Sequence, residues 1–454
     1  MSMSRPLKIG LAGLGTVGVG VLDLLRDHGG LLRARCGRSI EVVAVSARSR
    51  KARRGDHDMS AYRWFDDPVA MARDEKIDVL VELIGGEDGP AKAAVEAALG
   101  AGRHVVTANK ALLAHHGTEL AEMAERAGVA LGFEAAVAGG IPIIKTMRES
   151  LAGNAVSRLY GILNGTCNYI LSKMESEQRD FADVLKEAQE LGYAEADPAF
   201  DIGGFDAAHK LAILTSLAFG VKINFADVYV EGIGAITLND IRYARGLGYR
   251  IKLLGVAVDT GEGIEQRVHP ALVPIGSPIA EVGGVFNAVA VHGDFADDIL
   301  LSGRGAGAHP TASSVVSDIA DIARGIVLPP LGLAARSLAE CRRAPMRAHQ
   351  GGYYVAMELL DRPGEVAAVA RIFADEDISI ESIVQKGRAI ARKVPLRSGE
   401  TEPDTAPFIL ITHDTLESAM RKALQRIEAE GHARAPRMIR IEKFGEGQPC
   451  STAP

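Results

Sequence analysis

Three carboxylates and a lysine lie close together between residues 192 and 210. Glu195, Asp201 and Asp206 fall on a Gly/Pro-rich loop, GYAEADPAFDIGGFDAAHK, that leads into a helical pattern. Asp206 and Lys210 are four residues apart, so they share one face of that helix. The four residues after Lys210 are Leu-Ala-Ile-Leu, a composition typical of a core. A lysine there loses hydration, so it must pair with the carboxylates or exchange a proton.

Two explanations fit this cluster. Lys210 and Asp206 could form a buried i,i+4 ion pair that only stabilises the helix. Alternatively, the cluster could be an active site in which Lys210 gives and takes a proton. Asp197 precedes Pro198 and is better explained as a turn residue, and His209 is better explained by packing than by catalysis. The rest of the chain must decide between these explanations.

The elements that must position the cluster begin with an alternating pattern in the first third of the chain. Short apolar segments alternate there with helical patterns, which predicts a parallel, doubly wound sheet of the Rossmann type over residues 1–135. The strands are expected at residues 8–12, 41–46, 79–83, 104–107 and 130–133.

The remaining chain is predicted to form an α+β domain and a small C-terminal unit. Residues 136–335 would bind substrate and dimerise, with a helix at 310–326 that packs back on the first domain. Residues 336–350, rich in Arg and Ala, are expected to be a linker. Residues 351–445 show the β-α-β-β-α-β order of a ferredoxin-like unit, and residues 446–454 are expected to be a disordered tail.

A glycine-rich turn follows the first predicted strand and opens a helix. In the motif GLGTVG, Gly13 would permit the tight turn and Gly15 would let the backbone approach a pyrophosphate. Gly18 would allow close helix packing, while Thr16 and Val17 begin the helix whose N-terminus attracts the phosphates. This context predicts a dinucleotide site.

The end of the second predicted strand indicates which dinucleotide is preferred. It reads Val-Ser-Ala-Arg, with Arg48 where an acid would bind the 2′-hydroxyl of NAD(H). A cation at this point favours a 2′-phosphate, so NADP(H) is predicted as the preferred cofactor, with NAD(H) possible. Arg48 could instead belong to a solvated basic loop.

Two further strand ends carry candidate groups. Lys110 follows the strand at 104–107 and would lie beside the nicotinamide, unless it is only a helix N-terminal residue. Glu134 follows the last strand, and the bend after it has free backbone carbonyls that could bind a hard cation. Glu134 could instead support such a site without contacting the cation.

Composition excludes several classes of protein. A net charge of −7 and the lack of a basic run interleaved with aromatics argue against a nucleic-acid partner. No apolar segment has membrane-spanning length, and the four cysteines lack metal-ligand spacing. We therefore expect a soluble cytoplasmic protein with no membrane partner.

Seven sequence blocks resemble homoserine dehydrogenases of the monofunctional form, and they cover nearly all of residues 8–327. They are GLGTVG at 13–18, VTANKALLA around Lys110, EAAVAGGIPIIK from Glu134, NGTCNYIL from Asn164, GYAEADP from Gly192, FDAAHKLAIL from Phe205 and GRGAGAHPTASSVVSD from Gly303.

This resemblance implies a reversible hydride transfer between NADPH and L-aspartate 4-semialdehyde that gives L-homoserine, a step toward threonine, methionine and isoleucine. Lys210 would be the acid–base group, and Lys110 would assist the proton transfer. Glu195 and Asp206 would bind the substrate ammonium, with Asp201 facing the same pocket. The resemblance also places Gly192 in the substrate site, Gly307 in the cofactor site, and a monovalent cation, usually sodium, at Glu134, Val137, Gly139 and Ile141.

The C-terminal unit resembles an ACT domain in the stretches VAMELLDRPGEVAAVA from Val355 and ISIESIVQ from Ile378. The resemblance implies pairing across a homodimer or homotetramer. It also implies an amino-acid effector, with threonine expected, near Asp361 to Glu365, where helix-start amides could hold a carboxylate. The unit could instead only dimerise.

Two rival functions remain. Cys167 could be the nucleophile of a thiol-dependent semialdehyde dehydrogenase, although no downstream His motif supplies a base. The chain could also be a non-catalytic amino-acid-sensing regulator. Against that reading, both lysines and all three acids of the cluster are present.

Overall fold

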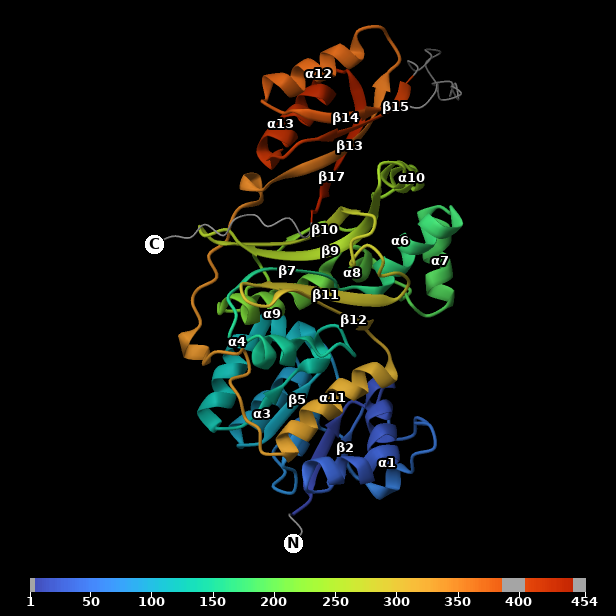
Figure 1. The fold of residues 1–454 in the computed structure, drawn as a ribbon. Coiled ribbons are helices and arrows are strands. Elements are labelled where there is room, and N and C mark those ends of the chain that lie inside the picture. The colour runs from blue at the N-terminus through green and yellow to red at the C-terminus, as the bar shows by residue number, and fades with distance from the viewer. Residues whose placement is uncertain (1–4, 386–404, 444–454) are drawn as a thin grey trace.

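The computed structural model describes residues 5–385 and 405–443, which form an elongated molecule with an N-terminal sheet, a central sheet and a C-terminal module (Figure 1). The tail predicted at 446–454 lies outside the described residues. Among the described residues, no helix is long and apolar enough to cross a membrane.

The N-terminal sheet consists of six parallel strands, which confirms the predicted Rossmann-type sheet. They are β1 (Leu7–Ala12), β2 (Ile40–Ser46), β3 (Arg63–Phe65), β4 (Val79–Glu82), β5 (His104–Thr107) and β6 (Leu131–Gly132). Their order is β3-β2-β1-β4-β5-β6, so the direction of winding reverses between β1 and β4. Ligands of such sheets bind at this reversal, beside the carboxyl ends of the strands.

Helices cover both faces of the N-terminal sheet. One face packs against α1 (Thr16–Cys36) and α11 (Ala308–Ala323), and the opposite face against α2 (Pro68–Ala72), α3 (Pro90–Gly100) and α4 (Lys110–Ala127). Helix α11 comes from far along the chain and returns to this sheet after the central sheet is complete. At the closest approach of α1 and α11, a Cβ on Gly20 would meet the Ala308 carbonyl oxygen at 2.9 Å.

The central sheet is antiparallel, with strands in the order β12-β11-β7-β9-β10. It buries one face against α6 and α9, and α9 also packs on α4 of the N-terminal sheet. The strands are β7 (Val156–Ile162), β9 (Tyr249–Asp259), β10 (Ile264–Pro274), β11 (Phe286–Gly293) and β12 (Asp297–Arg304), with the two-residue strand β8 (Tyr229–Val230) on β10. The helical segments of this region are α5 (Ile143–Lys145), the π-helical turn Thr146–Ser150, α6 (Gly165–Glu177), α7 (Phe181–Glu190), α8 (Ala199–Ile202), α9 (Phe205–Phe219) and α10 (Leu238–Gly246).

The C-terminal module, described over residues 350–385 and 405–443, has the predicted β-α-β-β-α-β order of long elements there. Two helices cover one face of four strands in the order β17-β13-β15-β14. The elements are β13 (Gln350–Leu360), α12 (Glu365–Asp375), β14 (Ile380–Val384), β15 (Thr405–Thr412), β16 (Thr415–Leu416), α13 (Glu417–Ala429) and β17 (Ala433–Ile441).

The module is joined to the central sheet by a direct strand pairing. Strand β17 runs parallel to the end of β10, with Arg440 opposite Ala271 and Ile441 opposite Leu272. Both sheets therefore continue into one mixed sheet (Figure 1). The segment expected to be a linker, 336–350, lies along the central region, where Arg343 forms a bridge with Ile264.

Buried charges support this junction. Arg440 is 1% exposed and donates to both carboxylate oxygens of Glu417, each at 2.8 Å, and to Glu231 at 3.0 Å. Arg267 of β10 donates to Glu442 at 2.7 Å. The Arg440–Glu417 pair lies within the module, whereas Arg440–Glu231 and Arg267–Glu442 cross the junction. Because an unpaired buried charge costs several kcal/mol, the two crossing pairs favour the joined arrangement.

Candidate active site

The cofactor turn contains three glycines, and the space around the Cβ position differs at each of them. Gly13 has a φ of +99°, and a Cβ there would meet the Leu83 carbonyl oxygen at 2.4 Å. A Cβ on Gly18 would meet the Gly13 carbonyl oxygen at 2.2 Å. Gly15, in contrast, has open space around its Cβ position, and it is the N-cap residue of α1. The open position is where a pyrophosphate could approach the backbone.

Thr16 and Val17 form the first residues of α1, directly after Gly15. Their amides belong to the first turn, whose N–H groups have no partner within the helix and which carries the positive end of the helix dipole. The predicted cofactor residues of the turn therefore lie at the β1–α1 junction, beside the reversal of the sheet.

The loop after β2 is held by an arginine that the sequence did not single out. Arg54 is 6% exposed, donates to the carbonyls of Ala52 at 2.8 Å and of Ser49, and lies 5.3 Å over the Trp64 ring. Arg48 is exposed just beyond the end of β2. The signal that could have found Arg54 is the tryptophan ten residues later, because guanidinium groups stack on indole rings.

Glu82 ties together the ends of β4 and β5. Its Oε1 accepts the amides of Ile84 at 2.7 Å and Gly85 at 3.0 Å, and its Oε2 accepts the Thr107 hydroxyl at 2.5 Å. The Thr107 oxygen in turn accepts the amide of Asn109 at 3.0 Å, the N-cap residue of α4. Glu82 is thus a positioning residue for the first residue of α4, Lys110.

Two lysines converge on a single carboxylate. Lys210 Nζ donates to Asp206 Oδ2 at 2.7 Å and to the Leu163 carbonyl at 2.7 Å. Lys110 Nζ lies 3.1 Å from Asp206 Oδ1. Lys110 is the first residue of α4 and Lys210 lies in the second turn of α9, and these two helices pack together between the two sheets. The predicted pairing of Lys210 with Asp206 is present, and Lys110 joins it.

The charges of this group depend on one another. Burial alone would raise the pKa of Asp206, but Lys210 and Lys110 hold it well below its usual range. The Asp206 carboxylate raises the pKa of Lys110, against the opposing effect of burial. The Lys110 side chain is 35% exposed and that of Lys210 is 10% exposed, so Lys110 is the more accessible of the two.

An asparagine that the sequence did not single out holds the acids in place. Asn164 Nδ2 donates to Asp201 Oδ1 at 2.9 Å and to Asp206 Oδ2 at 2.8 Å. Its Oδ1 accepts the amide of Cys167 at 2.8 Å and so caps α6. Burial and the neighbouring Asp206 charge raise the pKa of Asp201. The N-cap pattern Asn-Gly-Thr was visible in the sequence, but the link to the acids was not.

Glu195 and Gly192 lie at the rim rather than in the cluster. Gly192, with a φ of +73°, follows the end of α7. Glu195 is exposed, and its carbonyl accepts the side-chain amide of Gln189 at 3.1 Å. Its charge still contributes to raising the pKa of Lys110. The structure therefore brings together four predicted residues, Lys110, Asp201, Asp206 and Lys210. Glu195 is exposed to solvent at the edge of this group.

His209 and Cys167 are both buried beside the cluster. Burial lowers the pKa of His209 to about 4, and its ring packs 4.3 Å from that of Phe225. Burial and the nearby carboxylates of Asp201 and Asp206 raise the pKa of the Cys167 thiol well above its usual value. Its Sγ donates to the Asp201 carbonyl at 3.2 Å. A neutral, enclosed thiol is a poor nucleophile, which argues against the thioester mechanism.

The bend after Glu134 is built from unusual backbone. Ala138 and Gly139 have φ values of +54° and +48°, and a Cβ on Gly139 would meet the Gly305 carbonyl oxygen at 2.4 Å. The Ser314 hydroxyl of α11 donates to the Gly139 carbonyl at 2.6 Å. Nearby, Gly307 has a φ of +119° and is the N-cap residue of α11. The bend and the start of α11 are therefore fixed to each other.

The Glu134 carboxylate forms its hydrogen bonds with the backbone beyond this bend. Its two oxygens accept the amides of Ile144 at 2.8 Å and Lys145 at 2.9 Å. Burial and the adjacent Asp318 charge raise the pKa of Glu134 to about 7. The carboxylate thus holds the start of the following helical turn, and both of its oxygens already accept a backbone amide.

Family models and full-length relatives agree on which proteins this chain is similar to. Residues 13–134 match the family "Homoserine dehydrogenase, NAD binding domain", and residues 142–320 match "Homoserine dehydrogenase". The homoserine dehydrogenase of Neisseria gonorrhoeae is 45% identical over 447 residues, which cover 97% of this chain and 99% of that protein.

Solved structures agree with the sequence matches. A homoserine dehydrogenase from Thiobacillus denitrificans has a TM-score of 0.89 and 44% identity, covering 97% of this chain and 99% of that chain. A hyperthermophilic archaeal homoserine dehydrogenase in complex with NADPH has a TM-score of 0.60 and 26% identity, covering 71% of this chain and 99% of that chain.

Proposed function

The chain belongs to the homoserine dehydrogenase family, and from that premise we propose which residues carry out its reaction. The reaction interconverts L-aspartate 4-semialdehyde and L-homoserine. The single observation that carries the assignment of roles is the convergence of Lys210 and Lys110 on Asp206. An isolated structural ion pair would not need a second lysine from another domain.

Lys210 is proposed as the proton donor for reduction and the acceptor for oxidation. A bound NADPH would supply the hydride, and the carbonyl oxygen would then need a proton. An ammonium group has three N–H donors, and Lys210 spends two on Leu163 and Asp206. Within residues 5–385 and 405–443 the third donor has no hydrogen-bond partner, and it is proposed to reach the substrate oxygen. Lys110, more exposed and held charged by Asp206, would stabilise the negative charge that develops on that oxygen.

The substrate ammonium group is proposed to bind the carboxylates around this pair. Asp201 and Asp206 are held side by side through Asn164, and Glu195 lies at the rim near Gly192. The burial and like charge that raise the pKa of Asp201 would be offset by an incoming cation. An ammonium group is therefore the complement that this end of the site favours.

NADP(H) is proposed as the preferred cofactor, with NAD(H) as a possible substitute. The support is Arg48, exposed beyond β2 on a loop that Arg54 holds in place, at the position where the ribose 2′ group lies in such folds. The archaeal relative in complex with NADPH is consistent with this preference.

Replacing Arg48 with alanine tests this preference. We expect wild-type enzyme to have the higher kcat/KM with NADPH, and the ratio of NADPH to NADH efficiencies to fall about 10–100-fold in Arg48→Ala, the value of a lost charge-assisted hydrogen bond. Arg53→Ala, an 88% exposed neighbour, is the matched control and should keep the ratio. A wild-type preference for NADH would contradict the assignment.

A monovalent cation, expected to be sodium, is proposed at the bend after Glu134. Ala138 and Gly139 both have left-handed backbone at this bend, and backbone carbonyl oxygens are ligands that suit a hard cation. Because its carboxylate is occupied by the amides of Ile144 and Lys145, Glu134 would bind through its carbonyl. The other ligands would be the carbonyls of Val137, Gly139 and Ile141.

The C-terminal module is proposed to be an ACT domain that pairs in a homodimer or homotetramer and binds threonine. The support is its element order and the junction at Gly364, which has a φ of +98° and precedes the eleven-residue helix α12. The amides at that helix start could hold a carboxylate between Asp361 and Glu365.

Threonine binding is tested with the whole enzyme. We expect millimolar L-threonine to raise the melting temperature, because a ligand of the native state stabilises it, and to lower the rate of NADPH oxidation. D-threonine is the control and should do neither. An enzyme whose rate and melting temperature both ignore L-threonine would show that the module serves another purpose, such as dimerisation alone.

A further inference from the structure

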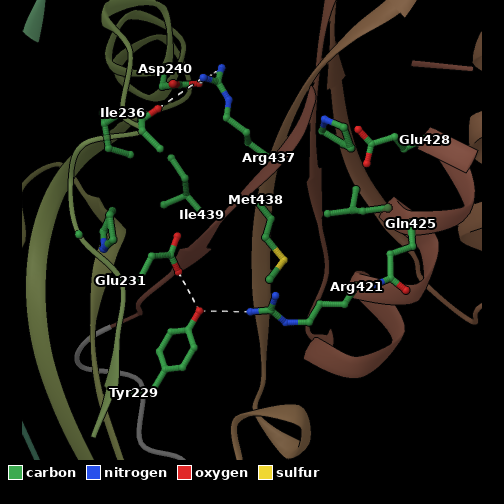
Figure 2. A pocket seen from close by; sticks show the side chains of 15 residues that line it. Tyr229, Glu231, Ile236, Asp240, Arg421, Gln425, Glu428, Arg437, Met438 and Ile439 are labelled. Carbon is green, nitrogen blue, oxygen red and sulfur yellow. Dashed lines mark hydrogen bonds and ion pairs between the residues drawn. The ribbon is translucent and has the colours of Figure 1, made fainter. Parts of the chain in front are cut away.

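An open cleft and a buried asparagine both hold polar groups whose bonding is incomplete, and they need different explanations. In the cleft between the module and the central region, Arg437 reaches Asp240 at 3.3 Å and the Ala235 carbonyl at 3.4 Å (Figure 2). Its side chain is 42% exposed, so solvent can complete its bonding. Asn287, in contrast, is 1% exposed, and its Oδ1 has no hydrogen-bond partner among the residues that the structure describes. A buried oxygen without a partner costs free energy, so a role beyond packing is expected for Asn287.

The side-chain nitrogen of Asn287 holds a backbone carbonyl of the active site. Asn287 is the second residue of β11, one position before Ala288, which lies opposite Ile162 at the end of β7. From there its Nδ2 donates to the Leu163 carbonyl oxygen at 3.0 Å. The atom that faces this oxygen must be the nitrogen, because a carbonyl oxygen can only accept.

The same carbonyl is one of the two acceptors that hold Lys210. Lys210 Nζ donates to the Leu163 oxygen and to Asp206 Oδ2, each at 2.7 Å. Each of these acceptors takes a second hydrogen bond from an asparagine, Asp206 from Asn164 at 2.8 Å and Leu163 from Asn287 at 3.0 Å. Because the bonds of an ammonium nitrogen are tetrahedral, fixing both acceptors also fixes the direction of the third N–H.

The opposite side of the Asn287 amide lies against the segment that leads into α11. A Cβ on Gly305 would overlap that amide and would lie 2.5 Å from its Oδ1. Gly305 also touches the bend at Gly139, since a Cβ on Gly139 would overlap the Gly305 carbonyl. Two residues after Gly305, Gly307 is the N-cap residue of α11. Asn287 therefore joins the carbonyl that holds Lys210 to the segment between the bend and α11.

Buried hydrogen bonds from α6 fix the start of β11 and with it the position of Asn287. Asn168 of α6 donates from Nδ2 to the carbonyls of Val282 at 3.2 Å and Phe286 at 3.0 Å. Its Oδ1 accepts Lys252 Nζ at 3.1 Å, and both side chains are almost fully buried. The backbone on which Asn287 stands is thus held in one place, as a side chain that orients another group requires.

We propose that Asn287 is a positioning residue for the proton transfer. It fixes the Leu163 carbonyl, and through that carbonyl it directs the third N–H of Lys210 relative to the segment that carries Gly307. Without this support the Lys210 ammonium group would turn, so the proton would be misdirected while the charges that bind the substrate stay unchanged. The proposal rests on the role proposed above for Lys210.

Asn287→Leu tests this role in the full-length enzyme, because leucine keeps the shape of asparagine but cannot donate. We expect kcat to fall about 10–100-fold, the usual effect of a misplaced catalytic group. The KM for the semialdehyde and the affinity for NADPH should stay as in wild type, since only the transition state loses an interaction. The solvent deuterium isotope effect on kcat should increase, because proton transfer becomes slower relative to the other steps.

Asn154→Leu is the matched control. The Asn154 Oδ1 is also buried without a partner in the described part of the chain, and it lies beside Gly293, at the opposite end of β11. Asn154→Leu should therefore keep the wild-type kcat and isotope effect. The same losses in this variant as in Asn287→Leu would show that they reflect packing around β11 and would overturn the proposal.

Gly305→Ala approaches the same contact from the other side and does not depend on how well Asn287→Leu folds. Its new methyl group would displace the Asn287 amide, so kcat should fall as in Asn287→Leu. In an Asn287→Ala background the methyl group has room, and the double variant should be no slower than the slower single variant. Losses that multiply in the double variant would show that Gly305 and Asn287 act independently.

The outcomes separate this proposal from the one on which it rests. A wild-type kcat in Asn287→Leu together with an impaired Lys210→Met would overturn the positioning role and leave Lys210 as the proton donor. A wild-type kcat in Lys210→Met would overturn the proton-donor role itself. A raised KM with an unchanged kcat and isotope effect in Asn287→Leu would show that Asn287 supports only substrate binding.

Discussion

Replacing Lys210 with methionine is expected to lower kcat by roughly 10²–10⁴-fold, the usual contribution of a positioned proton donor. Methionine keeps the length and apolar stem of lysine but can neither donate nor accept the proton. The free N–H of Lys210, left after its bonds to Leu163 and Asp206, would be lost with it. The rate is followed through NADPH oxidation with L-aspartate semialdehyde, and in reverse with L-homoserine.

Two controls make the Lys210 result interpretable. Lys222→Met removes an exposed lysine that pairs with Glu340, and it should keep its kcat. The melting temperature and NADPH affinity of Lys210→Met must remain measurable, because the substitution also removes a partner of the buried Asp206. If Lys210→Met kept near wild-type kcat while Asp206→Asn did not, Lys210 would not be the proton donor.

Replacing Asp206 with asparagine is expected to reduce both stability and activity. The substitution leaves the Lys110 and Lys210 ammonium groups without their shared counter-charge. Removing one partner of a buried ion pair typically costs 3–5 kcal/mol, and since Lys110 is partly hydrated we expect a loss of about 3 kcal/mol. Urea unfolding at neutral pH measures this loss.

The pH dependence of Asp206→Asn follows from the same interactions. Asp206 raises the pKa of Lys110, so without it Lys110 loses its proton at lower pH, and the alkaline fall in kcat should begin at lower pH. The pKa of Asp206 itself is depressed in the folded state. Its contribution to stability is therefore present above its unfolded pKa and lost as pH falls through the folded value, and Asp206→Asn should lack that acid-side loss. An alkaline limb identical to that of wild type would contradict the coupling.

The N-terminal sheet could be predicted because the sequence patterns that specify its strands lie within a few neighbouring residues. Parallel strands covered on both faces read as short apolar runs, and β1, β2, β4 and β5 show this pattern within one or two residues of the predicted ends. The sequence did not predict β3, because its three residues, Arg-Trp-Phe, are too few to show the pattern of a strand. The glycines of the cofactor turn were predictable for the same reason, since each role depends on neighbours within a few residues.

The site was predictable in its residue types but not in its connections. The i,i+4 relation of Asp206 and Lys210 follows from helix geometry alone. Asn164 donates to Asp201 and Asp206, which are 37 and 42 residues further along the chain. Helix or strand periodicity cannot predict contacts between residues so far apart in the sequence. Arg440 and Glu417 likewise resemble surface charges in the sequence, yet they are 23 residues apart and form a buried pair in the structure. The sequence predicted a separate C-terminal unit, and the structure continues its sheet into the central one.

Helix α11 has a consequence for how the protein is made. Its Val315 packs in one cluster with Val45 of the N-terminal sheet and Val21 of α1, so α11 covers this face of the sheet, yet it ends only at Ala323. A ribosome must therefore release more than two thirds of the chain before the first sheet loses its exposed apolar face. Until then the nascent cofactor domain exposes apolar surface of the kind that promotes aggregation and that chaperones bind. For the same reason, a fragment ending at residue 135 should aggregate rather than bind a dinucleotide.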